Sequence, residues 1–107
     1  MAETVPVIRA NERRRLAFAA RLRSAGRMTI CEVVNLSETG CKLKAAANFL
    51  EVGDTVSIKP DTLEPLTGTV RWKEDGCIGV EFHSPMYGPV VDHLAIMHVP
   101  KGSRVLV

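Results

Sequence analysis

The stretch "LTGTVRWKEDGCIGVEF", residues 66–82, contains two alternating runs of apolar and polar residues joined by Asp75-Gly76. Successive side chains of an extended chain point to opposite faces, so each run predicts a strand with one apolar face. An Asp-Gly turn between two such runs is typical of a β-hairpin. The alternation places Trp72 and Phe82 on the inward face of this hairpin, which favours core packing over exposed rings.

Four further segments upstream have strand character, and turn residues separate them about every ten positions. The four segments are residues 16–22, 28–34, 41–45 and 55–59. Downstream, "GPVVDHLAIM" at 88–97 has apolar residues at helical spacing and predicts a short helix. Six short strands with regular turn signals predict a small antiparallel barrel or sandwich.

The composition describes one ordinary globular domain, with 107 residues that are 46% hydrophobic and 24% charged. No apolar run approaches the ~18 residues of a membrane span, and no secretory h-region follows the N-terminal arginines. We therefore expect a cytoplasmic protein without membrane insertion. Cys31, Cys41 and Cys77 form no Cys-x-x-Cys pair, so they predict reduced, packed thiols without a metal site.

The positive charge is concentrated at the N-terminus. Residues 1–30 carry seven arginines, no lysine and two acids, whereas residues 31–107 carry seven basic and ten acidic side chains. A guanidinium offers a planar fork that binds phosphate or a guanine edge through two hydrogen bonds. This asymmetry indicates an anionic, planar partner.

The turn in "VVNLSETGCKL", residues 33–43, is longer than a tight hairpin requires and carries Asn35, Ser37 and Gly40. Asn and Ser side chains in such turns often bond their own backbone. They also provide short donors for a ligand, and Gly40 permits a positive φ or a close ligand approach. Both interpretations of the turn remain open from these residues alone.

"RANERRR" at 9–15 followed by "NLSETG" at 35–40 resembles the PilZ domain, whose signatures are R-x-x-x-R and (D/N)-x-S-x-x-G. "LEVGDTVSIK", "LTGTVRW" and "CIGVEF" resemble later strands of the family in order and spacing, so the resemblance covers roughly residues 9–82. It implies an all-β fold, a six-stranded antiparallel β-barrel of the split-barrel type, here with a short C-terminal helix. It also implies binding of the bacterial second messenger cyclic di-GMP. We divide the chain into a flexible basic arm (1–12), the barrel with its helix (13–99) and a tail (100–107).

The resemblance transfers ligand-binding roles to two segments. Asn35, Ser37 and Gly40 match the turn signature directly. For the arginines two registers remain: Arg9 and Arg13 match R-x-x-x-R literally, whereas the family's second arginine stands just ahead of the first strand, as Arg15 does before "LAFAARL". The latter register puts Asn11 at the first arginine position. The predicted ligand-binding residues are Arg9, Arg13, Arg14, Arg15, Asn35, Ser37 and Gly40.

The expected function is a cyclic di-GMP receptor that transmits the second-messenger level to a protein partner. A PilZ-like adaptor that has lost the ligand and acts only through protein contacts is the alternative. We expect no catalysis, cofactor or metal, because no nucleophile motif, P-loop or dinucleotide fingerprint is present. DNA or RNA binding is disfavoured, because aromatic residues make up 5% of the chain and stacking platforms require them.

Overall fold

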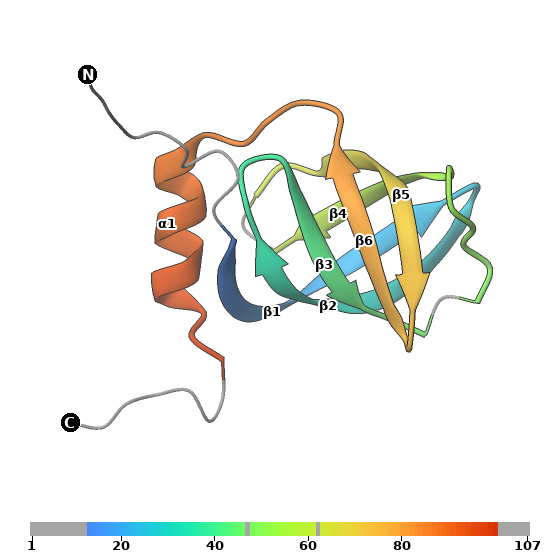
Figure 1. Cartoon of the computed structure of the whole chain (residues 1–107), viewed down its shortest axis with the longest axis horizontal. Coiled ribbons are helices and arrows are strands. Elements are labelled where there is room, and N and C mark those ends of the chain that lie inside the picture. Colours follow the sequence, from blue (N-terminus) through green and yellow to red (C-terminus); the bar gives the residue numbers. More distant parts are fainter. Residues whose placement is uncertain (1–12, 47, 62, 101–107) are drawn as a thin grey trace, which may run out of the picture.

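The computed structural model describes residues 13–46, 48–61 and 63–100. This part of the chain forms six strands and one helix: β1 (Arg14–Ser24), β2 (Arg27–Leu36), β3 (Gly40–Lys44), β4 (Thr55–Pro60), β5 (Leu66–Glu74), β6 (Cys77–Phe82) and α1 (Gly88–Met97). The strands close into an antiparallel barrel in the order β1-β2-β3-β6-β5-β4, and α1 lies at one end of it (Figure 1). The predicted six-stranded antiparallel barrel with a short C-terminal helix is confirmed.

The long strand β1 closes the barrel because it pairs on both edges. It pairs with β2 from Arg14 opposite Leu36 to Ser24 opposite Arg27, with an irregularity in register between Arg15 and Phe18. Near the hairpin it also pairs with β4, where Leu22 lies opposite Ile58. β1 begins at Arg14, two residues before the predicted start at Leu16, because the backbone there already pairs with β2.

The barrel interior is filled by aliphatic side chains from every strand. Leu22, Leu43, Ile58 and Val70 are completely buried, and Leu50 from the β3–β4 connection is buried with them. Val91, Leu94 and Ala95 of α1 join the same apolar cluster. The helix therefore completes the core at the end of the barrel where β1 begins.

An irregularity in the β5–β6 pairing changes which face the side chains of β5 occupy. Val70 lies opposite Val80, but the next pair along the strands is Trp72 opposite Gly79, so Arg71 is the extra residue of a β-bulge. Val80 is buried in the barrel, so its neighbour Gly79 faces outward and Trp72 with it. The predicted inward position of Trp72 is wrong, whereas Phe82 is buried as predicted.

The three cysteines are free thiols. Cys31 is buried, and desolvation raises the pKa of its thiol to about 11. Burial also raises the pKa of the Cys41 thiol. Both side chains are therefore protonated at neutral pH.

The described residues have neither a metal-ligand cluster nor a membrane-spanning helix. They hold no group of three or more His, Cys, Asp and Glu side chains that could bind a metal ion. Within the same ranges, no helix has both the length and the apolar character that crossing a bilayer requires.

Truncating a completely buried side chain of β1 should destabilise the barrel strongly. Leu22→Ala removes buried methyl groups between the two partner strands and should lower the free energy of unfolding by about 2–5 kcal/mol. Urea unfolding followed by circular dichroism measures this loss. Lys44→Ala, at an exposed position of β3, should change the free energy by less than about 0.5 kcal/mol. Equal losses for the two variants would contradict the assigned core.

Candidate functional site on the outer barrel wall

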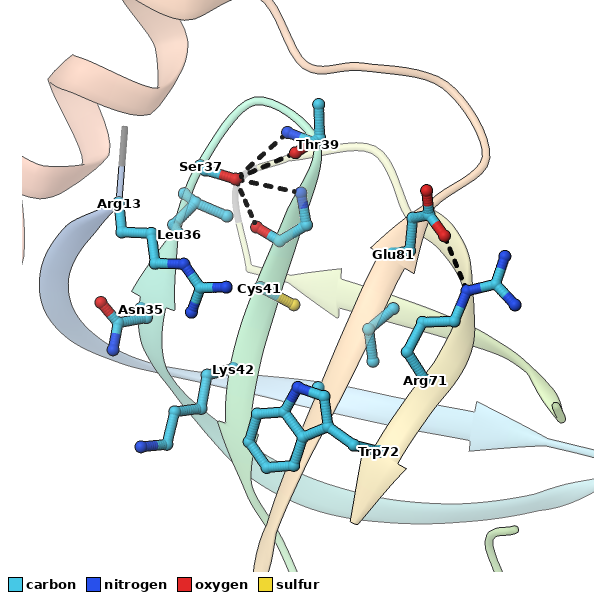
Figure 2. Close-up of a pocket in the computed structure, with 13 residues that line it drawn as sticks. Arg13, Asn35, Leu36, Ser37, Thr39, Cys41, Lys42, Arg71, Trp72 and Glu81 are labelled. Atoms are coloured by element: carbon cyan, nitrogen blue, oxygen red, sulfur yellow. Dashed lines mark hydrogen bonds and ion pairs between the residues drawn. The ribbon is translucent and has the colours of Figure 1, made fainter. Parts of the chain in front are cut away.

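A pocket of about 320 Å³ lies on the outer wall where β2, β3, β6 and β5 run side by side (Figure 2). This volume is at the lower end of the range for small-molecule sites. Its charged lining residues are Arg13, Lys42, Arg71 and Glu81, three cations against one anion. The pocket is therefore positively charged and suited to an anionic ligand.

The turn after β2 is held by the Ser37 side chain. The Ser37 Oγ accepts hydrogen bonds from the backbone N–H groups of Thr39 and Gly40, both at 3.2 Å. The Ser37 N–H donates to the Gly40 carbonyl at 2.9 Å. The Ser37 side chain therefore bonds the backbone of its own turn, which is one of the two interpretations that the sequence left open. The nearest acceptors for the hydroxyl proton are the Gly40 carbonyl and the Thr39 Oγ1, both at 3.4 Å, so this proton is only weakly engaged.

Gly40 is required for the approach of two strands. An added Cβ would lie 2.4 Å from the Val80 carbonyl oxygen on β6, which no side chain tolerates. Positive φ angles occur at Gly26, Gly53 and Gly76 among the described glycines, so of the two uses that the sequence left open for Gly40, a positive φ is not the one realised. Gly40 still lines the pocket, because the close strand contact forms part of its wall.

The predicted ligand-binding arginines point to different places at the start of β1. Arg13 lines the pocket, and Figure 2 shows its side chain extending towards β3. Arg14 instead forms an ion pair with Asp92 of α1. Arg15 is exposed opposite Asn35, and directly paired residues project from the same face, so its side chain borders the pocket-lining Asn35. Arg9 lies outside the described residues.

Trp72 contributes an aromatic surface to the pocket. Its indole packs directly on Gly79: a Cβ at that glycine would be 2.0 Å from the indole Nε1. Figure 2 shows the ring lying across β6 on the side of Lys42. The bulge residue Arg71 points outward beside it, and its Nε donates to Glu81 Oε1 at 2.6 Å.

Sequence reasoning missed most of the pocket lining, including the charged and aromatic side chains of Lys42, Arg71, Trp72 and Glu81. For Lys42 the alternation of "CKLKA" already indicated an outward position, but not which surface lay beside it. For Trp72, the usable signal was Gly79 at the opposite position of the hairpin. A tryptophan ring can cover a glycine on the neighbouring strand when both residues face the same side of the sheet.

Helix α1 is attached to both segments that form the pocket rim. Before the helix, the Met86 N–H donates to the Glu38 carbonyl in the 37–40 turn at 2.7 Å. After the helix, the Ala17 N–H of β1 donates to the His98 carbonyl at 2.8 Å. Together with the ion pair of Arg14, these contacts fix the start of β1 and the turn relative to each other.

A small closed barrel with a basic, tryptophan-bearing pocket on its outer wall is typical of a ligand-binding module. The chain matches the family model of the PilZ domain over residues 8–94, and it belongs to this family. PilZ domains are a known family of cyclic di-GMP receptors and serve as binding or adaptor domains. A search of curated proteins returned no match for this chain.

Filling the space beneath the indole should displace Trp72. Gly79→Ala places a methyl group where the ring lies, so the ring must lift towards solvent. Because Trp72 is the single tryptophan of the chain, intrinsic fluorescence reports on it alone. We expect a red-shifted emission and stronger quenching by acrylamide.

The control for this experiment is Gly26→Ala in the β1–β2 turn. That change introduces strain at a positive φ but adds no contact within 4 Å. It should leave the emission of the folded protein unchanged. An unshifted spectrum for Gly79→Ala would contradict the described position of Trp72.

Proposed function

We propose that this domain is a receptor for cyclic di-GMP, bound in the pocket on the outer wall, and has no catalytic activity of its own. In this proposal it acts in a bacterial cytoplasm and transmits ligand occupancy to a protein partner. One observation carries the proposal: Arg13 and the Asn35–Gly40 turn, which hold the two family signatures, converge on the same basic pocket.

The pocket chemistry complements the ligand. Cyclic di-GMP has two phosphates and two guanines, and each guanine presents O6 and N7 acceptors to an arginine fork. Arg13 and Lys42 supply positive charge for these groups. The exposed face of Trp72 offers a stacking platform for one purine, a contact worth about 1–3 kcal/mol in single-stranded nucleic acid binding. The weakly engaged Ser37 hydroxyl proton can be donated to a phosphate or guanine acceptor.

The start of β1 supports one of the two arginine registers. Because β1 begins at Arg14, the residue immediately ahead of the strand is Arg13. This favours the pair Arg9 and Arg13, which fits the signature literally. Arg15 is close enough to Asn35 to contribute as well, whereas Arg14 would have to leave Asp92 to reach the ligand.

The alternative is a PilZ adaptor that no longer binds cyclic di-GMP. Two observations favour it: Arg14 is paired with α1, and the Ser37 oxygen is already used by the turn. Of the three described arginines Arg13, Arg14 and Arg15, Arg13 alone lines the pocket. Direct titration distinguishes a receptor from such an adaptor.

Cyclic di-GMP should bind the intact chain and quench Trp72 fluorescence, with affinity measured in parallel by calorimetry. Arg13→Ala should weaken binding about 10- to 100-fold, because a charge-assisted hydrogen bond contributes about 1.5–3 kcal/mol. Trp72→Ala should weaken it about tenfold or more through lost stacking.

The matched control is Arg23→Ala, which removes an exposed arginine from β1 outside the pocket and should bind normally. Ser37→Ala is a less specific probe, because it also removes the bonds that hold the turn. No binding by the intact chain at micromolar protein in low salt would reject the receptor and leave the adaptor. Binding that Arg13→Ala left unchanged would reject the assigned pocket.

A further inference from the structure

A second surface with unused chemistry lies on the outer face of β1 and β2 near their shared hairpin. Arg21 and Arg23 of β1 are exposed, and their directly paired residues on β2 are Ile30 and Met28. The two aliphatic side chains are 59% and 51% exposed, although both are large and apolar. Directly opposed residues share one face, so these four residues form one arginine–aliphatic patch. None of them lines the pocket.

Arg21 and Arg23 are not directly opposite any acid, and the exposed Glu32, two residues from Ile30 on the same face of β2, lies opposite Lys44 of β3. Arg21 and Arg23 form no ion pair within the described ranges of the chain. On the other edge of β1 they lie opposite Lys59 and Ser57 of β4, so no acid borders them there. Lys59 donates to the carbonyls of Pro60 and Leu63, at 3.0 and 2.6 Å, and its positive charge stays without a carboxylate.

The hairpin that carries the patch is compact and lies far from α1. Ser24 pairs with Arg27, and the two turn residues, Ala25 and Gly26, both have positive φ, as in a tight two-residue turn. Figure 1 shows this end of β1 and β2 at the opposite side of the barrel from α1. A flat surface can therefore approach the hairpin without meeting the helix.

We propose that the arginine–aliphatic patch docks the domain peripherally on an anionic phospholipid bilayer. A bilayer surface presents phosphates next to an acyl boundary, so it matches guanidinium and aliphatic groups at the same time. Arginine binds phosphate through its planar fork, and its methylene stem packs beside the aliphatic side chains. The proposal is independent of the cyclic di-GMP site.

Other occupants fit the patch less well. A second copy docked on the same patch would bring two positively charged patches together, which like-charge repulsion opposes. Nucleic acid offers phosphates but leaves Met28 and Ile30 without an apolar partner, and the patch has no aromatic ring for stacking. An acidic protein segment matches the charge, and the experiment includes it as a competing outcome.

Co-sedimentation of the full chain with vesicles tests the proposal. The vesicles contain either phosphatidylcholine alone or three parts phosphatidylcholine to one part phosphatidylglycerol. We expect at least about tenfold stronger binding to the anionic vesicles, most of it lost between about 0.05 M and about 0.5 M salt, as screening requires. Arg21→Glu with Arg23→Glu should abolish binding, and Met28→Ser with Ile30→Ser should weaken it about fivefold or more.

Two controls separate the patch from general charge and apolarity. Lys73→Glu reverses an exposed charge on β5, which pairs with neither β1 nor β2, and Ile96→Ser removes an exposed apolar side chain of α1; both should bind vesicles about as well as the unmodified chain. Circular dichroism confirms that each variant is folded.

Three outcomes would overturn the proposal. The first is no binding to anionic vesicles, and the second is equal loss in the controls and the patch variants. The third is binding to soluble polyglutamate without binding to vesicles, which would assign the patch to an acidic protein segment. None of these results bears on nucleotide binding, which Arg13→Ala tests separately.

Discussion

The barrel depends on the pairing of β1 with β4, the first and last strands of the order β1-β2-β3-β6-β5-β4. At Ala20–Arg23, β1 lies between β2 and β4, and this double pairing converts a six-stranded sheet into a closed ring. Closure removes free edges and divides side chains into inward and outward sets. It also fixes the start of β1 beside the β2–β3 turn. Two segments more than twenty residues apart in sequence therefore meet at one pocket.

The pocket itself is produced by departures from regular alternation. The bulge at Arg71 turns Trp72 outward, and glycine at position 79 lets the indole lie on the backbone of β6. At position 40 the absence of a Cβ allows β3 and β6 to approach at Val80. A regular barrel with side chains at these positions would present a filled outer wall instead of a hollow one.

The fold was predictable because its determinants are local. The runs at 66–82 show alternation within each strand, and the helix at 88–97 shows its own period, so both were correctly assigned from sequence. The polar turn at 35–40 was also recognisable as a distinct feature. The outward position of Trp72 was not predictable from alternation. A β-bulge depends on the pairing between two strands, and the alternation within one strand does not show where the bulge lies. The ion pair of Arg14 with Asp92 joins residues 78 positions apart, and no local pattern encodes such a contact.

The arginines near the N-terminus are close in sequence but lie on different surfaces of the barrel. Neighbouring side chains of an extended chain point to opposite faces, so Arg13, immediately ahead of β1, reaches the pocket while Arg14 of β1 reaches α1. Arg27, across the hairpin, lies over the Phe49 ring with its guanidinium carbon 5.1 Å from the ring centroid. A strand rises about 3.3 Å per residue, so Arg13 and Arg23 are separated by roughly 30 Å along β1. That separation exceeds the Debye length of about 8 Å at physiological ionic strength. The charge at the hairpin therefore contributes little to the potential in the pocket, and the arginines of residues 13–27 act as separate local charges instead of one anion-binding cluster.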